Sequence, residues 1–589
     1  MKKLLQYLGN YKKESILGPL FKLLEASFEL IVPLVMAAII DTGVANADRP
    51  YIMKMSLVLF LLALIGLTCA ITAQYFAAKA AVGCATGLRH ALFEHIETLS
   101  FTEMDTVGTS TLITRMTSDV NQVQNGVNLV LRLFLRSPFI VFGAMVMAFT
   151  IDVKAALVFV VTIPLLSVVV FGIMLVSIPL YKKVQAALDK VLGITRENLT
   201  GSRVIRAFNK EQDEIAQFHE DNEALTKIQL YVGKISALMN PLTYIIINGA
   251  IVVLVWVGAI RVDNGNITQG QVVALVSYMS QILVELIKLA NLIININKSI
   301  ACMNRIETVL DMESSITGSL TSDGAGREGK ETIPTENAVV FSRVGLTYAG
   351  ASEEALSDID FTVRRGETIG IIGGTGSGKS SVVNLIPRFY DATRGEVLVD
   401  GKNVRDYTLE ELRAKVGVVL QKAVLFKGTI RENLSWGNSD ATDEEMYEAL
   451  ETAQAREFVD AKEGGLSYEI EQGGRNLSGG QRQRLTIARA LVKKPQILIM
   501  DDSASALDFA TDAALRKAIA HMDGQMTVFI VSQRAASIMQ ADKIVVLDDG
   551  EIVGLGTHED LLKDCEVYRE IYESQFKRTE EQQAGEAKR

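Results

Sequence analysis

The chain has 589 residues, of which 49% are hydrophobic and 22% are charged, and its net charge at pH 7 is −10. That length allows several domains, and the composition averages two unlike parts, because the long apolar runs all lie within the first three hundred residues. An acidic chain without a basic stripe has no electrostatic footprint for a nucleic-acid backbone, so we expect no nucleic-acid partner. Four scattered cysteines are interpreted as reduced packing residues: Cys69, Cys84, Cys302 and Cys565.

Six apolar segments are each long enough for the roughly 20 residues that a membrane-spanning helix needs. They lie at residues 16–41, 53–82, 133–151, 154–181, 241–261 and 270–298. Basic residues gather before the first segment, between the second and third, and between the fourth and fifth, whereas the opposite loops carry few. The positive-inside bias therefore predicts a multi-pass membrane protein with both termini in the cytoplasm.

Two intervals between the spans, residues 83–132 and 182–240, are too long for simple turns. Both are charged and largely free of proline, so we expect spans two to five to continue as helices well past the membrane, each pair joined by a short turn. Such a turn could contact a cytoplasmic domain through residues 101–110 or 206–210. The alternative is a helical hairpin that is merely solvated.

Polar residues recur at helical spacing inside the first and sixth predicted spans. They are Lys22, Glu25 and Glu29 in the first, and Glu285, Lys288 and Asn295 in the sixth. Ionisable residues within a membrane are functional candidates, so Glu29, Glu285 and Asn295 form a candidate cargo path. Lys22 with Glu25, and Glu285 with Lys288, could instead pair locally along each helix. The sequence leaves both interpretations open and does not name a cargo.

The pattern changes after the sixth span. Residues 1–313 form the predicted membrane domain, and the polar, Gly/Ser-rich stretch 314–336 reads as a linker. From residue 337 to 578 short β runs alternate with amphipathic helices, which predicts an α/β nucleotide-binding domain with a partly antiparallel accessory sheet. A charged tail, residues 579–589, follows.

A glycine-rich run lies between the apolar stretch 368–372 and the helix expected from Ser381 onward. Its residues are Gly373, Gly374, Thr375, Gly376, Ser377, Gly378, Lys379 and Ser380. This is a P-loop in the context of strand, turn and helix that the motif requires. The glycines let backbone N–H groups turn inward around a phosphate, Lys379 reaches the β- and γ-phosphates, and the Ser380 hydroxyl is placed for Mg²⁺. We include Ser381 among the predicted ATP-binding residues.

Further motifs stand in a fixed order around the P-loop. They are Tyr348, Gln421, the run Leu477-Ser478-Gly479-Gly480-Gln481, the apolar run Ile497-Leu498-Ile499-Met500 ending in Asp501, and Ser505-Ala506-Leu507-Asp508. With them the chain resembles a half-transporter of the ATP-binding cassette (ABC) exporter family over almost its whole length. The resemblance implies a membrane α-helical domain of six transmembrane helices, of the type IV exporter kind, fused to an α/β P-loop nucleotide-binding domain.

The resemblance also implies a role for each motif. Tyr348 would stack on adenine, while Ser380, Gln421 and Asp501 would hold Mg²⁺. The run 477–481 is similar to the signature motif, which completes the γ-phosphate site of a second cassette, and 505–508 is similar to the D-loop. The implied cofactors are ATP and Mg²⁺, and the implied reaction is ATP hydrolysis coupled to transport across the lipid bilayer of a prokaryotic-type plasma (inner) membrane.

Two residues depart from the family pattern. Asp502 stands where the family has the glutamate that polarises the attacking water, and its carboxylate is drawn back by about 1.5 Å, one C–C bond. A misplacement of about 1 Å can cost on the order of a hundredfold in rate. Gln533 stands where the family has a switch histidine, and an amide cannot titrate near neutrality. Both changes fall in the site built on this chain's own P-loop.

Asp502 and Gln533 therefore predict a slow ATP site on this chain. The intact signature motif then makes sense opposite a competent P-loop, which predicts a second, different half-transporter as partner. The cargo would be a small molecule, lipid or peptide. The alternatives are a homodimeric exporter with two weak sites, or a channel or regulatory membrane protein gated by its cassettes.

Overall fold

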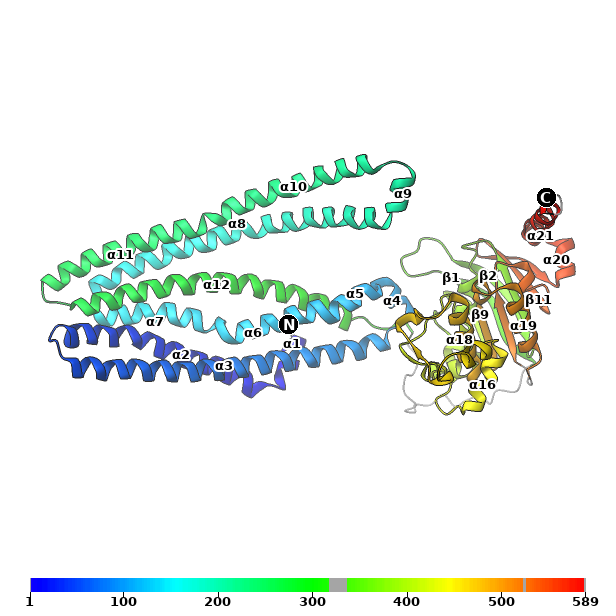
Figure 1. Cartoon of the computed structure of the whole chain (residues 1–589), viewed down its shortest axis with the longest axis horizontal. Helices are drawn as coiled ribbons and strands as arrows, with labels where there is room; N and C mark the ends of the chain where they lie inside the picture. The colour runs from blue at the N-terminus through cyan, green and yellow to red at the C-terminus, as the bar shows by residue number, and fades with distance from the viewer. Residues whose placement is uncertain (1, 317–335, 523–525, 587–589) are drawn as a thin grey trace. The chain divides into compact units, whose positions relative to one another are not determined.

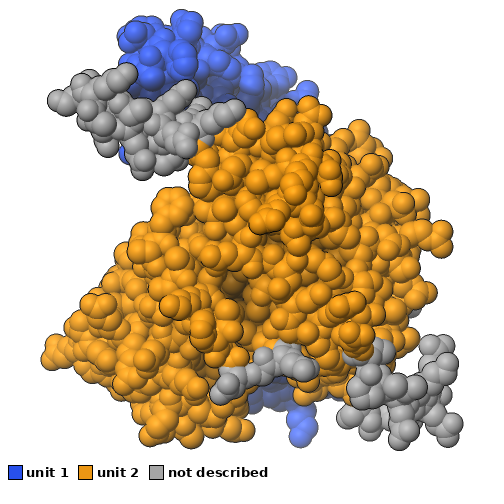
Figure 2. All heavy atoms as spheres, turned by 90° about the vertical axis from the view of Figure 1, so that its right-hand side faces the viewer, with its two compact units in different colours: residues 1–97, 109–312 blue, residues 98–108, 313–589 orange. Residues whose placement is uncertain are grey.

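The computed structural model describes residues 2–316, 336–522 and 526–586 (Figure 1). The chain forms two compact units, residues 1–97 with 109–312 and residues 98–108 with 313–589 (Figure 2). Most of the predicted linker, 317–335, lies outside the described residues, as do the last three residues of the predicted charged tail, 587–589. The end of the last helix, which reaches Glu586, takes up the rest of that tail.

The first unit is made of long helices. Their bounds are α1 Lys2–Gly9, α2 Lys12–Ala38, α3 Arg49–Thr98, α5 Thr109–Thr114, α6 Val120–Leu129, α7 Arg136–Ile151, α8 Val153–Thr200, α9 Ser202–Ala207, α10 Glu211–Ala237, α11 Met239–Asp263 and α12 Gln269–Leu310. Six helical stretches are long and apolar enough to cross a membrane: 12–44, 49–98, 109–151, 153–200, 211–263 and 269–310. The six predicted spans are confirmed.

Two of these helices extend far beyond the thickness of a bilayer, because α3 has 50 residues and α8 has 48. At 1.5 Å per residue each is about 70 Å long, more than twice the roughly 30 Å of hydrocarbon. Each ends at a short helix, α4 (Phe101–Val107) after α3 and α9 after α8. For spans two and four, the structure thus shows a helix that continues to a short turn; that these extensions lie in the cytoplasm stays a prediction.

Local signals fix where the helices begin and how they pack. The Asp152 side chain accepts a hydrogen bond from the Ala155 N–H at 2.8 Å and starts α8, and Thr268 forms a capping box with Gln271 at the start of α12. Helix α12 lies at the centre of the unit, against α2, α6, α7, α8 and α11, and buries Tyr278 completely. Helices α10 and α11 follow one another end to end, and both run alongside α8 (Figure 1).

The second unit contains a six-stranded and a four-stranded sheet. The six-stranded order is β12-β11-β3-β10-β9-β6, and the four-stranded order is β2-β1-β4-β5. Strand bounds are β1 Asn337–Leu346, β2 Leu356–Arg364, β3 Thr368–Gly373, β4 Arg394–Val399, β5 Lys402–Asn403, β6 Val416–Val419, β7 Gly428–Thr429, β8 Glu469–Ile470, β9 Ile497–Asp501, β10 Thr527–Val531, β11 Lys543–Asp548 and β12 Glu551–Gly556. The larger sheet is parallel except for β12, and the smaller sheet is antiparallel, as predicted.

Ten helices complete the described part of the second unit. They are α4, α13 Lys379–Leu385, α14 Leu409–Lys415, α15 Ile430–Ser435, α16 Asp443–Thr452, α17 Arg456–Asp460, α18 Gly479–Val492, α19 Phe509–Ala520, α20 His558–Asp564 and α21 Glu566–Glu586. Although α4 comes from far earlier in the chain, the Phe101 ring lies 4.7 Å from that of Phe389 and the Tyr390 hydroxyl donates to Asp105 at 2.5 Å. The contact predicted for residues 101–110 is therefore confirmed for α4.

All four cysteines are free and buried, as predicted for packing residues.

Candidate nucleotide-binding site

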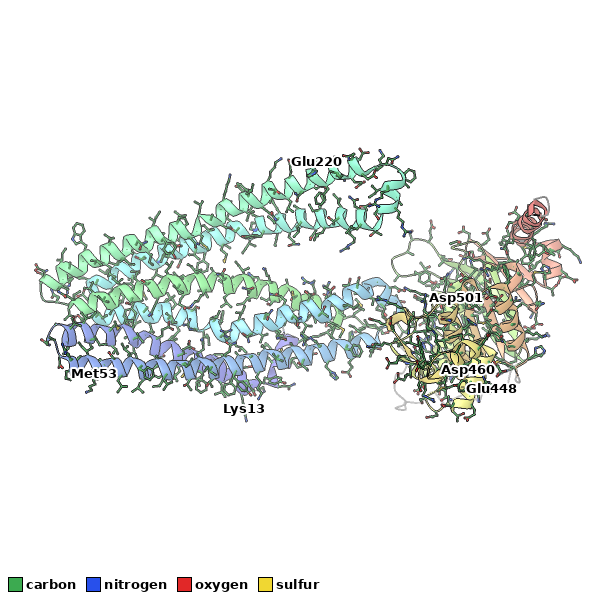
Figure 3. The ribbon with its side chains drawn as sticks, in the orientation of Figure 1. Lys13, Met53, Glu220, Glu448, Asp460 and Asp501 are labelled. Atoms are coloured by element: carbon green, nitrogen blue, oxygen red, sulfur yellow. The ribbon has the colours of Figure 1, made fainter. Side chains whose placement is uncertain are left out.

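The parallel strands of the larger sheet end at one edge, and the chain leaves that edge through the predicted site residues. Strand β3 ends at Gly373, β9 at Asp501 and β10 two residues before Gln533, while β6 ends two residues before Gln421. Because these strands are neighbours in the order β3-β10-β9-β6, their ends lie side by side. Figure 3 shows Asp501 inside the second unit. The edge thus gathers residues that are far apart in the sequence.

The P-loop needs its glycines for close approach and for backbone angle. A β-carbon on Gly373 would lie 2.1 Å from the Leu547 carbonyl oxygen, and Gly378 has φ +89°, a left-handed angle that favours glycine. The buried Lys379 ammonium donates to the carbonyl oxygens of Gly373 at 3.1 Å and Gly374 at 2.5 Å. Burial lowers the pKa of Lys379, and the nearby Asp502 and Asp501 carboxylates oppose this shift. The Lys379 ammonium is therefore placed at the P-loop, where it could donate hydrogen bonds to the oxygens of a bound phosphate.

Two of the three residues predicted to hold magnesium, Ser380 and Asp501, are in direct contact, and Gln421 contacts the neighbouring Asp502. Ser380 donates its hydroxyl to Asp501 at 2.9 Å, and the Gln421 amide donates to Asp502 at 3.3 Å. Burial raises the pKa of Asp501, the bond from Ser380 opposes that rise, and the Asp502 charge adds to it. A hydroxyl and one buried carboxylate fit Mg²⁺, which is bound by few protein oxygens together with phosphates and water. A bound divalent cation would offset the burial of this charge.

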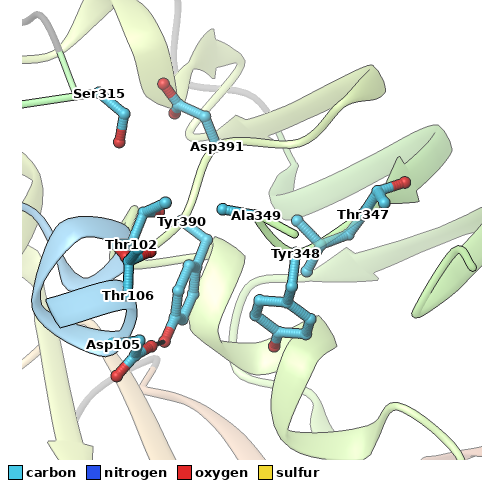
Figure 4. A pocket seen from close by; sticks show the side chains of 10 residues that line it. Thr102, Asp105, Thr106, Ser315, Thr347, Tyr348, Ala349, Tyr390 and Asp391 are labelled. Carbon is cyan, nitrogen blue, oxygen red and sulfur yellow. Dashed lines mark hydrogen bonds between the residues drawn. The ribbon is translucent and has the colours of Figure 1, made fainter. Parts of the chain in front are cut away.

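Tyr348 borders a cavity of about 320 Å³ between the β1–β2 connection and α4 (Figure 4). Its hydroxyl lies 2.8 Å from the Ser381 hydroxyl, and its ring meets the Tyr390 ring edge-on at 5.1 Å. Tyr390 in turn reaches Asp105 of α4. Burial raises the pKa of Tyr348. The aromatic residue predicted for adenine is therefore linked to the P-loop helix on one side and to α4 on the other.

The two departures from the family pattern both lie near the C-terminal end of β10. Asp502 follows β9 with φ +44°, and its N–H donates to the Val531 carbonyl at 2.9 Å. Gln533 is exposed, and its carbonyl accepts the Gln575 amide of α21 at 2.8 Å. The oxygen of the same amide accepts the Ala535 N–H at 2.9 Å. Gln575 thus holds the switch loop, a role that no sequence motif indicated.

The signature and D-loop residues adjoin one another. Ser478 and Gln481 form a capping box at the start of α18, behind the buried Leu477. A β-carbon on Gly479 would meet nothing within 4 Å, whereas one on Gly480 would lie 3.2 Å from the Ala506 carbonyl oxygen. The rest of the D-loop, Ser505, Leu507 and Asp508, is tied in by hydrogen bonds: Ser505 to the Asp502 carbonyl, Arg534 to the Leu507 carbonyl, and Asp508 as the cap of α19. Ser478 and Gly479 are exposed, so they are open to a partner.

In the first unit, Arg136 joins the two predicted cargo-path glutamates. It donates to Glu29 and to Glu285 at 2.7 Å each, and Glu285 also accepts from Ser137 and Lys288 at 2.8 Å. Glu285 is only 3% exposed. Asn295 does not join them, because its amide donates to the Asn291 carbonyl at 2.9 Å. Arg136 lies within the third predicted span, 133–151, but is not among the residues predicted for the cargo path, and the structure buries it within α7.

The neighbouring pair predicted on span one is also present, with Lys22 donating to Glu25 at 2.6 Å. The local pairing interpretation thus matches the geometry of Lys22, Glu25, Glu285 and Lys288. Contact of Glu29, Glu285 or Asn295 with a cargo stays a prediction.

Comparison with known proteins matches both units. Residues 15–286 match the ABC transporter transmembrane region, and residues 356–505 match the ABC transporter domain. An uncharacterized ABC transporter ATP-binding protein of Mycobacterium tuberculosis is 37% identical over 97% of each chain. An ATP-dependent lipid A-core flippase of Desulfotalea psychrophila is 33% identical over 82% of this chain and 83% of its own. The structure of a bacterial Atm1-family ABC exporter with ATP bound is 22% identical with a TM-score of 0.77, covering 96% of this chain and 99% of that one.

Proposed function

Since the chain belongs to the ABC transporter family, whose exporters couple ATP hydrolysis to transport and work as dimers in a lipid bilayer, we propose that it is one half of a heterodimeric exporter with a slow ATP site of its own. The observation that carries the proposal is the pair Asp502 and Gln533 in one composite site. The Asp502 side chain is one methylene group shorter than that of glutamate, and Gln533 lacks a titratable ring. The exporter would lie in a plasma membrane, with both termini of this chain in the cytoplasm.

Residues of this chain would bind ATP well at that site. Tyr348 would stack on the base, the P-loop N–H groups and Lys379 would hold the phosphates, and Ser380, Gln421 and Asp501 would hold Mg²⁺. Magnesium would neutralise charge on the β- and γ-phosphates. Asp502, which accepts from the Gln421 amide at 3.3 Å, would orient water poorly for attack on the γ-phosphate.

The signature motif would serve the other site. Ser478 and Gly479 are exposed at the start of α18, where they can approach a γ-phosphate bound by the partner. An intact signature motif on a chain whose own P-loop site is slow is useful only if the partner's P-loop, which this signature faces, is competent. The partner would carry the glutamate and histidine that this chain lacks. Closure of the two cassettes would reach the membrane helices through α4, which is continuous with α3 and α5.

The cargo would be a small molecule, lipid or peptide. The lipid A-core flippase among the relatives supports an amphipathic cargo for this chain. The domains would run from 1 to 313 for the membrane part and from 337 to 578 for the cassette.

The test compares two variants in the purified complex. Gly479→Leu should remove most steady-state phosphate release, because losing a donor to a transferring group costs a factor of about 100 to 1,000. Asp502→Asn should cost comparatively little, because it alters only the slow site. Position 479 is exposed and a β-carbon there would meet nothing within 4 Å in this chain, so we expect the variant to fold, which thermal melting of the complex checks.

ATP binding is measured in parallel for both variants, and co-purification with the product of the adjacent gene identifies the partner. If Asp502→Asn abolishes turnover as thoroughly as Gly479→Leu, this chain's own site is catalytic. The asymmetry and the inferred partner then both lose their support.

A further inference from the structure

The first unit contains a cavity of about 860 Å³ between α8, the α10–α11 connection and α12. It lies apart from the Arg136 cluster, because neither Arg136, Glu29 nor Glu285 lines it. Its volume is within the range of small-molecule sites. The residues that line it therefore indicate which class of small molecule it could bind.

The lining changes character along the helices. Helices α8 and α12 run in the same direction, towards α9 and towards the end of α12 at Leu310 (Figure 1). At one end the cavity is lined by Ile173, Met174 and Ile287, and towards the other end by Lys182 and Lys298. At 1.5 Å per residue the lysines lie about 14 Å beyond Ile173 on α8 and about 16 Å beyond Ile287 on α12. One end is apolar and the other is cationic.

The two lysines have no anionic counterpart within the cavity. No aspartate or glutamate lines it among the described residues, and none of the ion pairs found between described residues involves Lys182 or Lys298. Other polar side chains at the same end, Gln185 and Asn297, are neutral. Two cations facing one cavity repel each other and attract an anion.

A third polar group points to a ligand independently. The Ser177 hydroxyl lines the cavity, is only 7% exposed, and has no hydrogen-bond partner within the described residues. A buried hydroxyl without a partner costs free energy that a bound acceptor would restore. Ser177 lies one and a half turns before Lys182 on α8, between the apolar and the cationic ends.

We propose that this cavity binds an amphipathic anion, with its negative head group between Lys182 and Lys298 and its hydrophobic body along Ile173, Met174 and Ile287. Charge-assisted hydrogen bonds from both ammonium groups hold a phosphate or sulfonate head. Burial of the hydrophobic body supplies the remaining affinity. The assignment of this anion as the cargo of the exporter rests on the proposed function, but its binding to the cavity is independent of ATP turnover.

The experiment uses the full-length chain with its co-purifying subunit in phosphatidylcholine nanodiscs. Three probes share a dodecyl chain and differ in the head: dodecyl phosphate, dodecylphosphocholine and dodecyltrimethylammonium. Binding is measured by microscale thermophoresis without ATP. Dodecyl phosphate should bind at least tenfold more tightly than the other two, because only its head carries an unbalanced negative charge.

Variants locate the head group. Lys182→Gln and Lys298→Gln should each weaken dodecyl phosphate binding about tenfold, the effect of one charge-assisted contact. Lys183→Gln is the matched control, because this exposed neighbour on α8 does not line the cavity. Replacing both lysines by glutamate should reverse the preference in favour of dodecyltrimethylammonium. That reversal requires a folded protein, so it separates recognition from misfolding.

Nanodiscs containing phosphatidylglycerol distinguish the source of the anion. Competition by this lipid with dodecyl phosphate assigns the cavity to a two-chain lipid, and lack of competition assigns it to a single-chain anion. Equal affinity for the three heads, or dodecyl phosphate binding that is unchanged in both lysine variants, overturns the inference. Neither result bears on the slow ATP site, which phosphate release tests separately.

Discussion

At the scale of single residues, the consecutive carboxylates Asp501 and Asp502 occupy different environments. Asp501 is 7% exposed and its pKa is raised, chiefly by burial, whereas Asp502 is half-buried. A carboxyl whose pKa in the folded state exceeds the unfolded value stabilises the fold at pH values below the unfolded pKa. That contribution disappears as pH rises through the folded pKa. The ionised Asp501 therefore destabilises the cassette at neutral pH unless a cation offsets its charge.

Replacing Asp501 by asparagine should raise the melting temperature of the cassette in magnesium-free buffer at pH 7. A gain of roughly 1 kcal/mol would shift the melting temperature of a domain of this size by about 2–4 °C. The same variant should lose the dependence of ATP binding on Mg²⁺. Thermal melting and nucleotide binding, each with Mg²⁺ and with a chelator, measure both effects.

Asp502→Asn is the control for this pair, because the less buried carboxylate should give no gain in melting temperature and should retain the Mg²⁺ dependence. The assignment of Asp501 as the magnesium residue is wrong if ATP binding by Asp501→Asn still responds to Mg²⁺ as the unmodified protein does.

Most of the residues that could be predicted from the sequence belong to a motif of fixed order or pair with a near neighbour along the chain. Lys379 and Ser380 could be named from the P-loop alone. Arg136 could not, because the residues that it joins lie 107 and 149 positions away and are brought near only by helix packing. Gln575 lies 42 positions after Gln533 in a helix without any distinctive pattern. Long-range partners of this kind are set by tertiary contacts, which periodicity does not encode.

At the scale of elements, α21 is tied to the switch loop by one side chain. The helix is anchored by Tyr568, which is fully buried and whose hydroxyl lies 2.7 Å from the His558 ring nitrogen Nδ1. From this anchor Gln575 reaches both the Gln533 carbonyl and the Ala535 N–H. The position of the switch loop therefore depends on a helix near the end of the chain.

Gln575→Ala should loosen that loop. Each of the two hydrogen bonds is worth about 1 kcal/mol, so the Ala535 amide should exchange with solvent on the order of 5- to 30-fold faster. Hydrogen–deuterium exchange read by mass spectrometry over residues 527–541 measures the change. Ser574→Ala is the matched control, because the Ser574 hydroxyl donates to the Ile571 carbonyl within its own helix. Unchanged exchange in Gln575→Ala would show that other contacts hold the loop.

The Arg136 cluster ties α2, α7 and α12 together inside the first unit. Removing one partner of a buried pair leaves an uncompensated charge and typically costs 3–5 kcal/mol. Arg136→Gln should therefore lower the melting temperature of the full-length protein strongly. Glu29→Gln should change it little, since the Glu29 side chain is 41% exposed and a solvated pair is worth about 1 kcal/mol or less.

A second measurement separates pairing from cargo contact. If Glu285 serves the fold, Glu285→Gln should lower stability without changing which compounds stimulate ATP turnover. The double variant with Arg136→Gln should then be less destabilised than the sum of the two singles. Full stability with an altered stimulation profile would instead place Glu285 on the cargo path.

At the scale of the whole molecule, the sequence predicted both the membrane domain and the cassette, but it placed a single boundary between them, after residue 313. The six spans follow from apolar length, and the cassette follows from motifs in order. The short helix α4 could not be assigned to the second unit from the sequence, because Tyr390 lies 285 residues from its partner Asp105. Its own signals, a capping box from Ser100 to Glu103 and seven helical residues, indicate only that a helix starts there.

Because α4 belongs to the second unit, the cassette cannot be expressed whole as one continuous C-terminal fragment that begins after the linker. A fragment that begins at residue 337 would encode a cassette without one of its own helices, leaving the ring of Phe389 without Phe101 and the Tyr390 hydroxyl without Asp105. Such a fragment would expose an aromatic surface patch that promotes self-association in solution. A synthetic peptide of residues 98–108, added in trans, would be its natural complement.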